Sequence, residues 1–181
     1  MGWRNTPDGF GRVTRLLHWL MAAAILFMLV FGTRLHSLQP GLANLWLYGL
    51  HKSIGLCLLT LVLVRLAWHR ISPPPGPLGN PDLLPQRLAR WGHRLIYLLL
   101  VAIPLSGWIA SSASGIDTVL FGRWTIPAIA PVSEAWENAG WAAHGALTKL
   151  LMAVLIVHVA AAVKRQVAGD GTLRRMWRGR T

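Results

Sequence analysis

Residues 144–158, HGALTKLLMAVLIVH, decide the fold, because they form a stretch that can cross a membrane as a helix with a histidine at each end. Thirteen mostly apolar residues separate His144 from His158. Fourteen residues of α-helix rise about 21 Å and return a side chain to within about 40° of its first direction. The two histidines are therefore predicted to share one helix face, one near each surface of a bilayer.

The chain contains four apolar segments of this kind, at residues 16–33, 47–68, 91–112 and 141–163. Each has about 18 to 23 residues, enough to span a hydrocarbon core of about 30 Å. Only 13% of the chain is charged, whereas soluble domains have about 25%. The first segment has no small-residue cleavage site, so we expect a mature span and not a signal peptide. The sequence predicts an all-α, four-helix transmembrane bundle, with residues 1–181 as a single domain.

The net charge of +12 could suggest nucleic-acid binding, but the positions of the charges indicate a membrane protein with no nucleic-acid partner. Fourteen of the eighteen Lys and Arg residues lie in the two terminal tails or in the loop between the second and third segments, with its flanks. The other four are Arg34, Lys52, Arg123 and Lys149. Positive charge collects on the cytoplasmic side of membrane proteins. Both termini are therefore expected to be cytoplasmic, with the basic tails against anionic lipid head groups.

The histidines are the polar residues that stand out in this apolar chain. Five of the seven lie inside the apolar segments, near their ends: His18, His51, His93, His144 and His158. The remaining two, expected at the solvated surface, are His36 and His69. Polar side chains inside a membrane are costly and usually functional.

Depth sorts the five histidines into two layers. His51 begins the second segment on the side of His144, so these two lie level with each other in an outer layer. His18 and His93 both lie on the inner side, at the depth of His158, and either could be its partner. Two facing imidazoles per layer are what a six-coordinate haem iron needs, and helical bundles hold haem between facing helices.

Small residues support the haem interpretation, since Ala22, Gly55 and Ala162 each follow a histidine by one helical turn and leave room for a flat ring. A zinc or copper site is disfavoured because structural zinc needs four close ligands, while the layers are about 20 Å apart. All six acidic residues lie in tails or loops, which also disfavours a proton pump. A small transporter or structural bundle without haem stays open as an alternative.

Several stretches together resemble the bacterial cytochrome b561 family, which is related to the cytochrome b subunits of nickel-iron hydrogenases and formate dehydrogenases. They are LLHWLMAAAI (16–25), LHKSIGLCLL (50–59), GHRLIYLLLVAIPLSGWIASSASG (92–115) and HGALTKLLMAVLIVHVAAAVK (144–164). The resemblance covers nearly the whole chain. It implies a bundle in the bacterial inner membrane that holds two haem b groups.

The resemblance also implies which residues hold each group. It assigns His51 and His144 as the ligands of the outer haem, and His18 and His158 as the ligands of the inner haem. His93 then lies in the vicinity of a ubiquinone site. Relatives often carry two histidines after the lysine that corresponds to Lys164, whereas this chain has Arg165 and Gln166. If that pair helps relatives to bind quinone, the inner site works differently here.

The family resemblance implies an oxidoreductase that moves electrons across the membrane. Its members include superoxide oxidases, in which superoxide gives an electron at the outer haem and ubiquinone is reduced near the cytoplasmic side. Lys52 and Arg123 are the expected catalytic residues, because their positive charges can steer the superoxide anion. The alternative is a cytochrome b subunit that carries electrons between a dehydrogenase or hydrogenase partner and quinone, with some other periplasmic donor.

Overall fold

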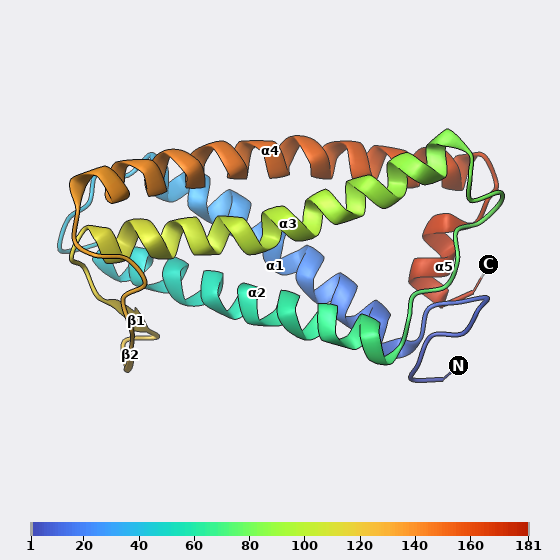
Figure 1. Cartoon of the computed structure of the whole chain (residues 1–181), viewed down its shortest axis with the longest axis horizontal. Helices are drawn as coiled ribbons and strands as arrows, with labels where there is room; N and C mark the ends of the chain where they lie inside the picture. The colour runs from blue at the N-terminus through green and yellow to red at the C-terminus, as the bar shows by residue number, and fades with distance from the viewer. Residues whose placement is uncertain (1, 181) are drawn as a thin grey trace.

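A computed structural model describes residues 2–180 and consists mainly of four long helices (Figure 1). A two-stranded hairpin precedes the fourth long helix, and a short helix follows it. The elements in chain order are α1 (Arg12–His36), α2 (Leu45–Ile71), α3 (Leu84–Ala113), β1 (Thr118–Leu120), β2 (Trp124–Ile126), α4 (Glu134–Val167) and α5 (Thr172–Arg178).

The four long helices contain the four predicted segments and extend beyond them at both ends. Each is long and apolar enough to cross a membrane. Large apolar side chains cover the outside of the bundle, as Leu20, Val30 and Ile156 illustrate. Hydrocarbon is a suitable solvent for such a surface, and the helical backbone satisfies its own hydrogen bonds. The prediction of an all-α, four-helix transmembrane bundle is confirmed.

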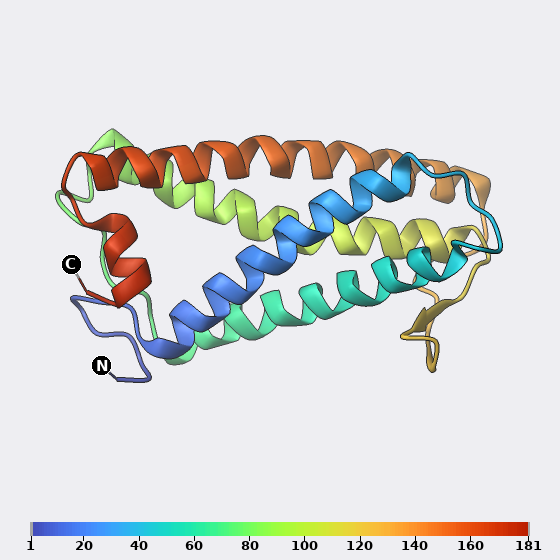
Figure 2. The same cartoon turned by 180° about the vertical axis from the view of Figure 1, so that it is seen from behind.

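The helices run alternately up and down, so both chain ends lie at the same end of the bundle (Figures 1 and 2). We call it the terminal end; it also holds α5 and the loop between α2 and α3. The opposite end carries the β1–β2 hairpin, and we call it the hairpin end. The predicted outer layer of histidines corresponds to the hairpin end, and the predicted inner layer to the terminal end.

Local sequence explains where the later helices begin and end. The hydroxyl of Ser133 caps α4 by accepting from the backbone N–H of Trp136 at 3.5 Å. Glu134 and Glu137 occupy the first turn of α4, and Lys164 and Arg165 occupy its last turn. Acids near the N-terminus and bases near the C-terminus both suit the helix dipole. In α3 the helix continues through Pro104, as lipid-embedded helices can when neighbouring groups satisfy the freed carbonyl.

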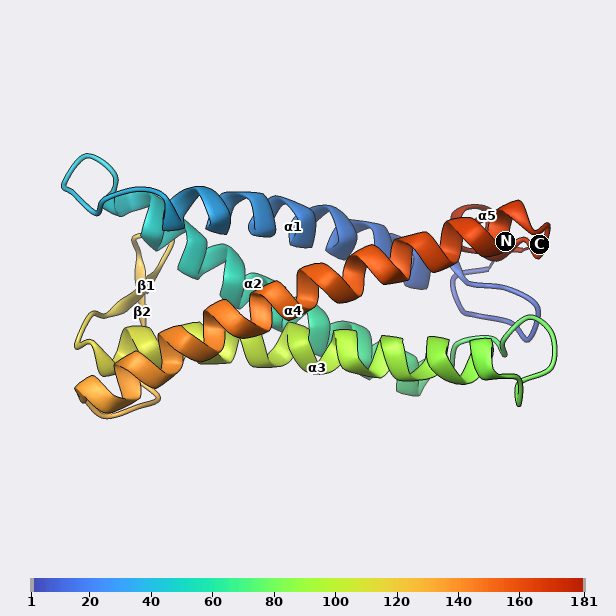
Figure 3. The same cartoon turned by 90° about the horizontal axis from the view of Figure 1, so that it is seen from above.

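The bundle core is a compact apolar cluster at mid-depth. Helix α3 packs along α4, α1 packs along α2, and α2 contacts α3 (Figure 3). The buried residues of the cluster are Met21, Ile25, Val62, Leu99, Leu100 and Leu151. Leu151 lies midway along α4 between His144 and His158, and Met21 follows His18 by nearly one turn. The core therefore separates the two histidine layers.

The hairpin was not predicted from the sequence. Its strands pair antiparallel, with Thr118 opposite Ile126. Phe121 and Gly122 turn the chain at positive φ, 48° and 69°, which is the backbone of a tight hairpin turn. The hairpin rests on α2, because the N–H of Phe121 donates to the hydroxyl of Ser53 at 2.9 Å. The third loop therefore covers part of the hairpin end.

A single arginine links three segments of the chain at the terminal end. Arg175 of α5 is only 5% exposed. Its guanidinium donates to the backbone carbonyls of Pro7, Asp8 and Gly76 at 3.1, 3.0 and 2.8 Å. One side chain thus joins the N-terminal segment, the loop after α2 and the C-terminal helix.

Candidate functional site

Two of the predicted ligands meet at the hairpin end. The ring centroids of His51 on α2 and His144 on α4 are 6.2 Å apart, with the planes at 74°. A metal–imidazole bond is about 2 Å long, so two imidazoles on opposite sides of one iron have centroids roughly 6 Å apart. The observed spacing therefore fits a single iron between the two rings.

Two glycines leave room for these rings. A Cβ atom added to Gly32 on α1 would lie 3.1 Å from Cε1 of His51. A Cβ added to Gly107 on α3 would lie 3.0 Å from Nδ1 of His144. Any larger residue at either position would press on an imidazole. All four long helices therefore shape this layer, and its residues fit a haem held by two histidines.

A hydrogen bond fixes which nitrogen of His144 is free. Nδ1 of His144 lies 2.9 Å from the backbone oxygen of Ile103. A carbonyl oxygen only accepts, so Nδ1 carries the proton and Nε2 keeps its lone pair for a metal. In His51 the Nδ1 atom is buried and has no hydrogen-bond partner within residues 2–180. This orphaned polar atom is a second sign that the layer is built for a group beyond the chain itself.

Three histidines gather at the terminal end. The ring of His158 on α4 lies 5.1 Å from the ring of His93 on α3. His93 is exposed, and its Nδ1 donates to the backbone oxygen of Ala89 at 2.7 Å. His18 on α1 lies within range of charge interaction with both His158 and His93. The ring contact is thus between His93 and His158, while His18 lies within range of charge interaction with both. Only the family resemblance chooses His18 as the ligand.

Arg65 is a member of this layer that the sequence analysis missed. Its Nη2 lies 3.2 Å from Nδ1 of His18, and its Cζ lies 5.7 Å from the centre of the Tyr97 ring. Arg65 had been counted among the charges of a cytoplasmic flank. It follows His51 by fourteen residues, the same interval that separates His144 from His158. That interval was the available signal, because it puts both α2 residues on one helix face.

His69 also differs from its expected place at the solvated surface. The structure shows it half-buried, with its ring 5.9 Å from the ring of Tyr97. Its Nε2 atom is buried and has no partner within residues 2–180. The expectation for His69 was therefore wrong. Because α2 extends to Ile71, it keeps this residue within the bundle. His36 is exposed, as expected.

The two expected catalytic cations occupy different settings. Lys52 on α2 is half-buried, and its Nζ donates to the hydroxyl of Ser111 at 3.1 Å and to the carbonyl of Asp117 at 3.0 Å. Arg123 is exposed on the turn of the hairpin, and its backbone N–H donates to Leu120 at 3.0 Å. Lys52 thus ties α2 to the third loop directly beside His51.

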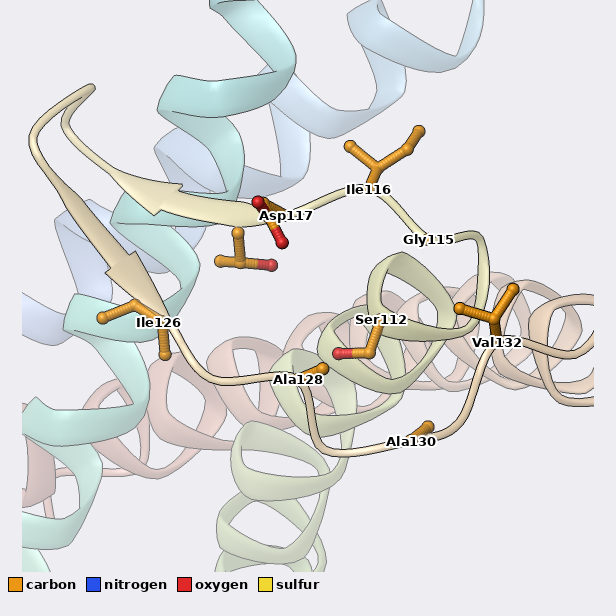
Figure 4. Close-up of a pocket in the computed structure, with 9 residues that line it drawn as sticks. Ser112, Gly115, Ile116, Asp117, Ile126, Ala128, Ala130 and Val132 are labelled. Atoms are coloured by element: carbon orange, nitrogen blue, oxygen red, sulfur yellow. The ribbon is translucent and has the colours of Figure 1, made fainter.

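A small hollow lies next to these contacts (Figure 4). Its volume of about 140 Å³ is below the range of roughly 300 to 1,000 Å³ that is usual for ligand pockets. Ser112, Asp117 and Val132 are among the residues that line it, and none of the predicted haem ligands does. The hollow is therefore a feature of the loop packing, separate from the histidine layers.

Arg165 and Gln166 take part in the packing of α4 against α5. Arg165 forms an ion pair with Asp170. Gln166 accepts from the backbone N–H of Arg174 at 3.0 Å. Burial alone would raise the pKa of the Asp170 carboxyl, but hydrogen bonds from Thr172 and the Arg165 guanidinium outweigh it and lower that pKa. The side chains of Arg165 and Gln166 thus help to hold α5 against the end of α4.

The described chain offers paired histidines for haem and no larger ligand cluster. Within residues 2–180, no three His, Cys, Asp or Glu side chains come together as a possible metal site. Haem needs only two axial ligands from the protein. A membrane bundle with a histidine pair between its helices, flanked by glycines, defines the class of b-type membrane cytochromes.

Comparison with known proteins agrees with this class. The family model described as prokaryotic cytochrome b561 matches residues 9–179. The chain therefore belongs to the prokaryotic cytochrome b561 family, as the sequence motifs implied. It is a multi-pass membrane protein of electron transfer, and membership of the family implies that it binds haem b.

Individual relatives match over almost their whole length. The chain is 34% identical to "Cytochrome b561 homolog 2" of Escherichia coli K12 over 180 residues, covering 97% of this chain and 95% of the relative. It is 27% identical to "Probable superoxide oxidase CybB" of Yersinia pestis over 162 residues, covering 88% and 90%. It is 26% identical to "Cytochrome b562" of Cereibacter sphaeroides over 181 residues, covering 95% and 97%.

Proposed function

We propose that this protein oxidises superoxide on the periplasmic side of a bacterial inner membrane and reduces ubiquinone near the cytoplasmic side. When bound, two haem b groups would supply one-electron transfer, so that two superoxide ions yield two O₂, and ubiquinone takes two electrons and two protons. The name of the Yersinia pestis relative supports the choice of superoxide. The observation that carries the proposal is the 6.2 Å spacing of His51 and His144.

The four ligand roles are those that the family resemblance implies. His51 and His144 would hold the haem at the hairpin end, and His18 and His158 the haem at the terminal end. Each haem would be held by two histidines, an arrangement whose chemistry would favour simple electron transfer over oxygen binding. The Ile103 carbonyl keeps His144 in the tautomer that can bind a metal. Because Gly32 and Gly107 have no side chain, they leave room for the rings of His51 and His144.

Lys52 and Arg123 would act at the entrance for superoxide. Lys52 adjoins the ligand His51 in sequence, and Arg123 is exposed on the hairpin above α2. Cations beside a low-dielectric surface raise the local concentration of an anion and its association rate. Both residues therefore serve as steering groups, while Lys52 also holds the third loop through Ser111.

His93 would act at the ubiquinone site. It is exposed on α3 at the terminal end, adjacent to His158, so a quinone can reach it from the lipid. Because its Nδ1 donates to Ala89, its Nε2 is available as a hydrogen-bond acceptor or, when protonated, as a donor. Because Arg165 and Gln166 bond to Asp170 and Arg174 around α5, His93 would be the residue that contacts the quinone.

The proposed orientation places the termini in the cytoplasm, because most cations lie at that end. A single cysteine on the hairpin tests it. Cys57, the one cysteine of the chain, is first changed to serine. In that background, Thr125→Cys should react with a membrane-impermeant maleimide in intact spheroplasts, and Arg180→Cys should react only after lysis. The reverse pattern would overturn the orientation.

The function itself is tested with the purified protein in nanodiscs. Pyridine haemochrome analysis should give two haem b per chain. A xanthine oxidase superoxide source should then drive rapid ubiquinone reduction that stops when superoxide dismutase is added. Two haems without superoxide-driven reduction, together with a stable co-purifying dehydrogenase or hydrogenase subunit, would instead support the alternative role as a cytochrome b subunit.

A further inference from the structure

Arg65 is a half-buried cation with a buried Nε atom, at the level of the terminal-end ligands. It lies six residues before the end of α2, and His18 lies six residues after the start of α1. These helices run in opposite directions, so both residues are at one depth. The 3.2 Å contact between Nη2 of Arg65 and Nδ1 of His18 places the guanidinium against the ring of a proposed haem ligand.

No carboxylate neutralises Arg65 within the described chain. Its described contacts are with His18, with the sulfur of Met21 at 3.8 Å and with the ring of Tyr97. Its Nε atom is buried without a partner within residues 2–180. The imidazoles around it, His69 among them, supply no negative charge. The guanidinium keeps its proton at every ordinary pH, so this layer contains a fixed charge of +1.

Within residues 2–180, no cationic side chain forms a hydrogen bond with the ring of His51 or His144 or lies over it. Lys52, which adjoins His51 in sequence, points to Ser111 and to the Asp117 backbone. The Asp117 carboxylate also interacts favourably with the Lys52 ammonium. The two layers are therefore electrostatically different, although each offers histidine ligands from two helices.

We propose that Arg65 raises the reduction potential of the terminal-end haem and so makes it a stronger electron acceptor. This inference rests on the proposed function, since it takes His18 as a ligand of that haem. A fixed positive charge favours the state that holds one more electron. The effect is strong where little water screens it, because Coulomb energy scales inversely with the local dielectric constant. Arg65 thus acts through its positive charge and does not itself react. By favouring the reduced state of the terminal-end haem, it directs electrons toward the quinone side.

The test is a spectroelectrochemical titration of purified holoprotein. His51→Ala serves as the background, because it should remove the hairpin-end haem and leave one signal from the terminal end. In this background, Arg65→Gln should lower the midpoint potential by at least about 59 mV, which corresponds to a tenfold change in the equilibrium constant for one-electron reduction. Arg65→Lys should keep most of the potential. Arg70→Gln, the same charge change at an exposed position of α2, should change it little.

Each outcome decides the inference. An unchanged or raised potential in Arg65→Gln overturns it, as does an equal shift in Arg70→Gln. Loss of the remaining haem in Arg65→Gln, with retention in Arg65→Lys, also overturns it, because Arg65 would then act in holding the group. Failure of the proposed function appears separately, as wild-type protein that lacks superoxide-driven quinone reduction while Arg65→Gln still shifts the potential.

Discussion

Nδ1 of His144 on α4 donates a 2.9 Å hydrogen bond to the backbone carbonyl of Ile103 on α3. The hydroxyl of Ser106 donates to the same oxygen at 2.8 Å. Because the acceptor belongs to the main chain, the direction of the imidazole depends on the path of α3 and on how closely α3 approaches α4. Hydrogen bonds of this kind orient a metal ligand and select its tautomer.

Close approach at this point depends on Gly107, which gives the first prediction. Gly107→Ala places a methyl group 3.0 Å from Nδ1 of His144, so the ring must move out of line with His51. We expect pyridine haemochrome analysis to fall from two haems per chain toward one. Gly145→Ala is the matched control, because its added methyl group meets no atom within 4 Å. Full haem content in Gly107→Ala would contradict the proposed position of the haem.

The partner of His158 gives the second prediction, since His93 contacts its ring and His18 lies within range of charge interaction with it. His18→Ala should remove one haem from the purified protein, because it deletes an axial ligand. His93→Ala should keep both haems and raise the KM for ubiquinone, because it alters the quinone site alone. Reduced-minus-oxidised spectra and haem stoichiometry separate the two. The opposite result would reassign the terminal-end ligand to His93.

The helices and one histidine pair could be predicted from the sequence because both depend on helical periodicity and length. His51 and His144 were placed together by counting depth along two segments, and the structure brings their rings together. Counting depth could not choose between His18 and His93, since it contains no information on which helix faces which. The packing of α3 along α4 decides that His93 contacts His158.

Other features were missed for separate physical reasons. Arg65 was counted as a flanking charge, because the rule for cytoplasmic cations sums charges by side of the membrane and ignores the helix face. The hairpin has strands of three residues each, too short for a pattern of alternating apolar residues to stand out. Its position depends on the contact between Phe121 and Ser53, which no local pattern reveals.

Electrostatic steering gives the third prediction. Lys52→Gln and Arg123→Gln should each lower the second-order rate with superoxide, together by about tenfold at low ionic strength. The loss should shrink in high salt, because salt screens the charges. Lys149→Gln, which removes an exposed cation from α4, is the control and should leave the rate unchanged. Stopped-flow measurement of superoxide decay gives the rates, and a loss that is independent of salt would exclude steering.

The carboxyl of Asp170 gives the last prediction, on the attachment of α5. Besides its ion pair with Arg165, it accepts from the backbone N–H of Thr172 at 2.8 Å, and its pKa is lowered. Its stabilisation is therefore complete above the ordinary aspartate pKa of about 3.9 and is lost as the pH falls through the lower folded value. At neutral pH, Asp170→Asn should speed hydrogen exchange in α5 by about two- to fivefold. The exposed Asp82→Asn should not, and a wild-type α5 that already loosens well above pH 4 would contradict the assignment.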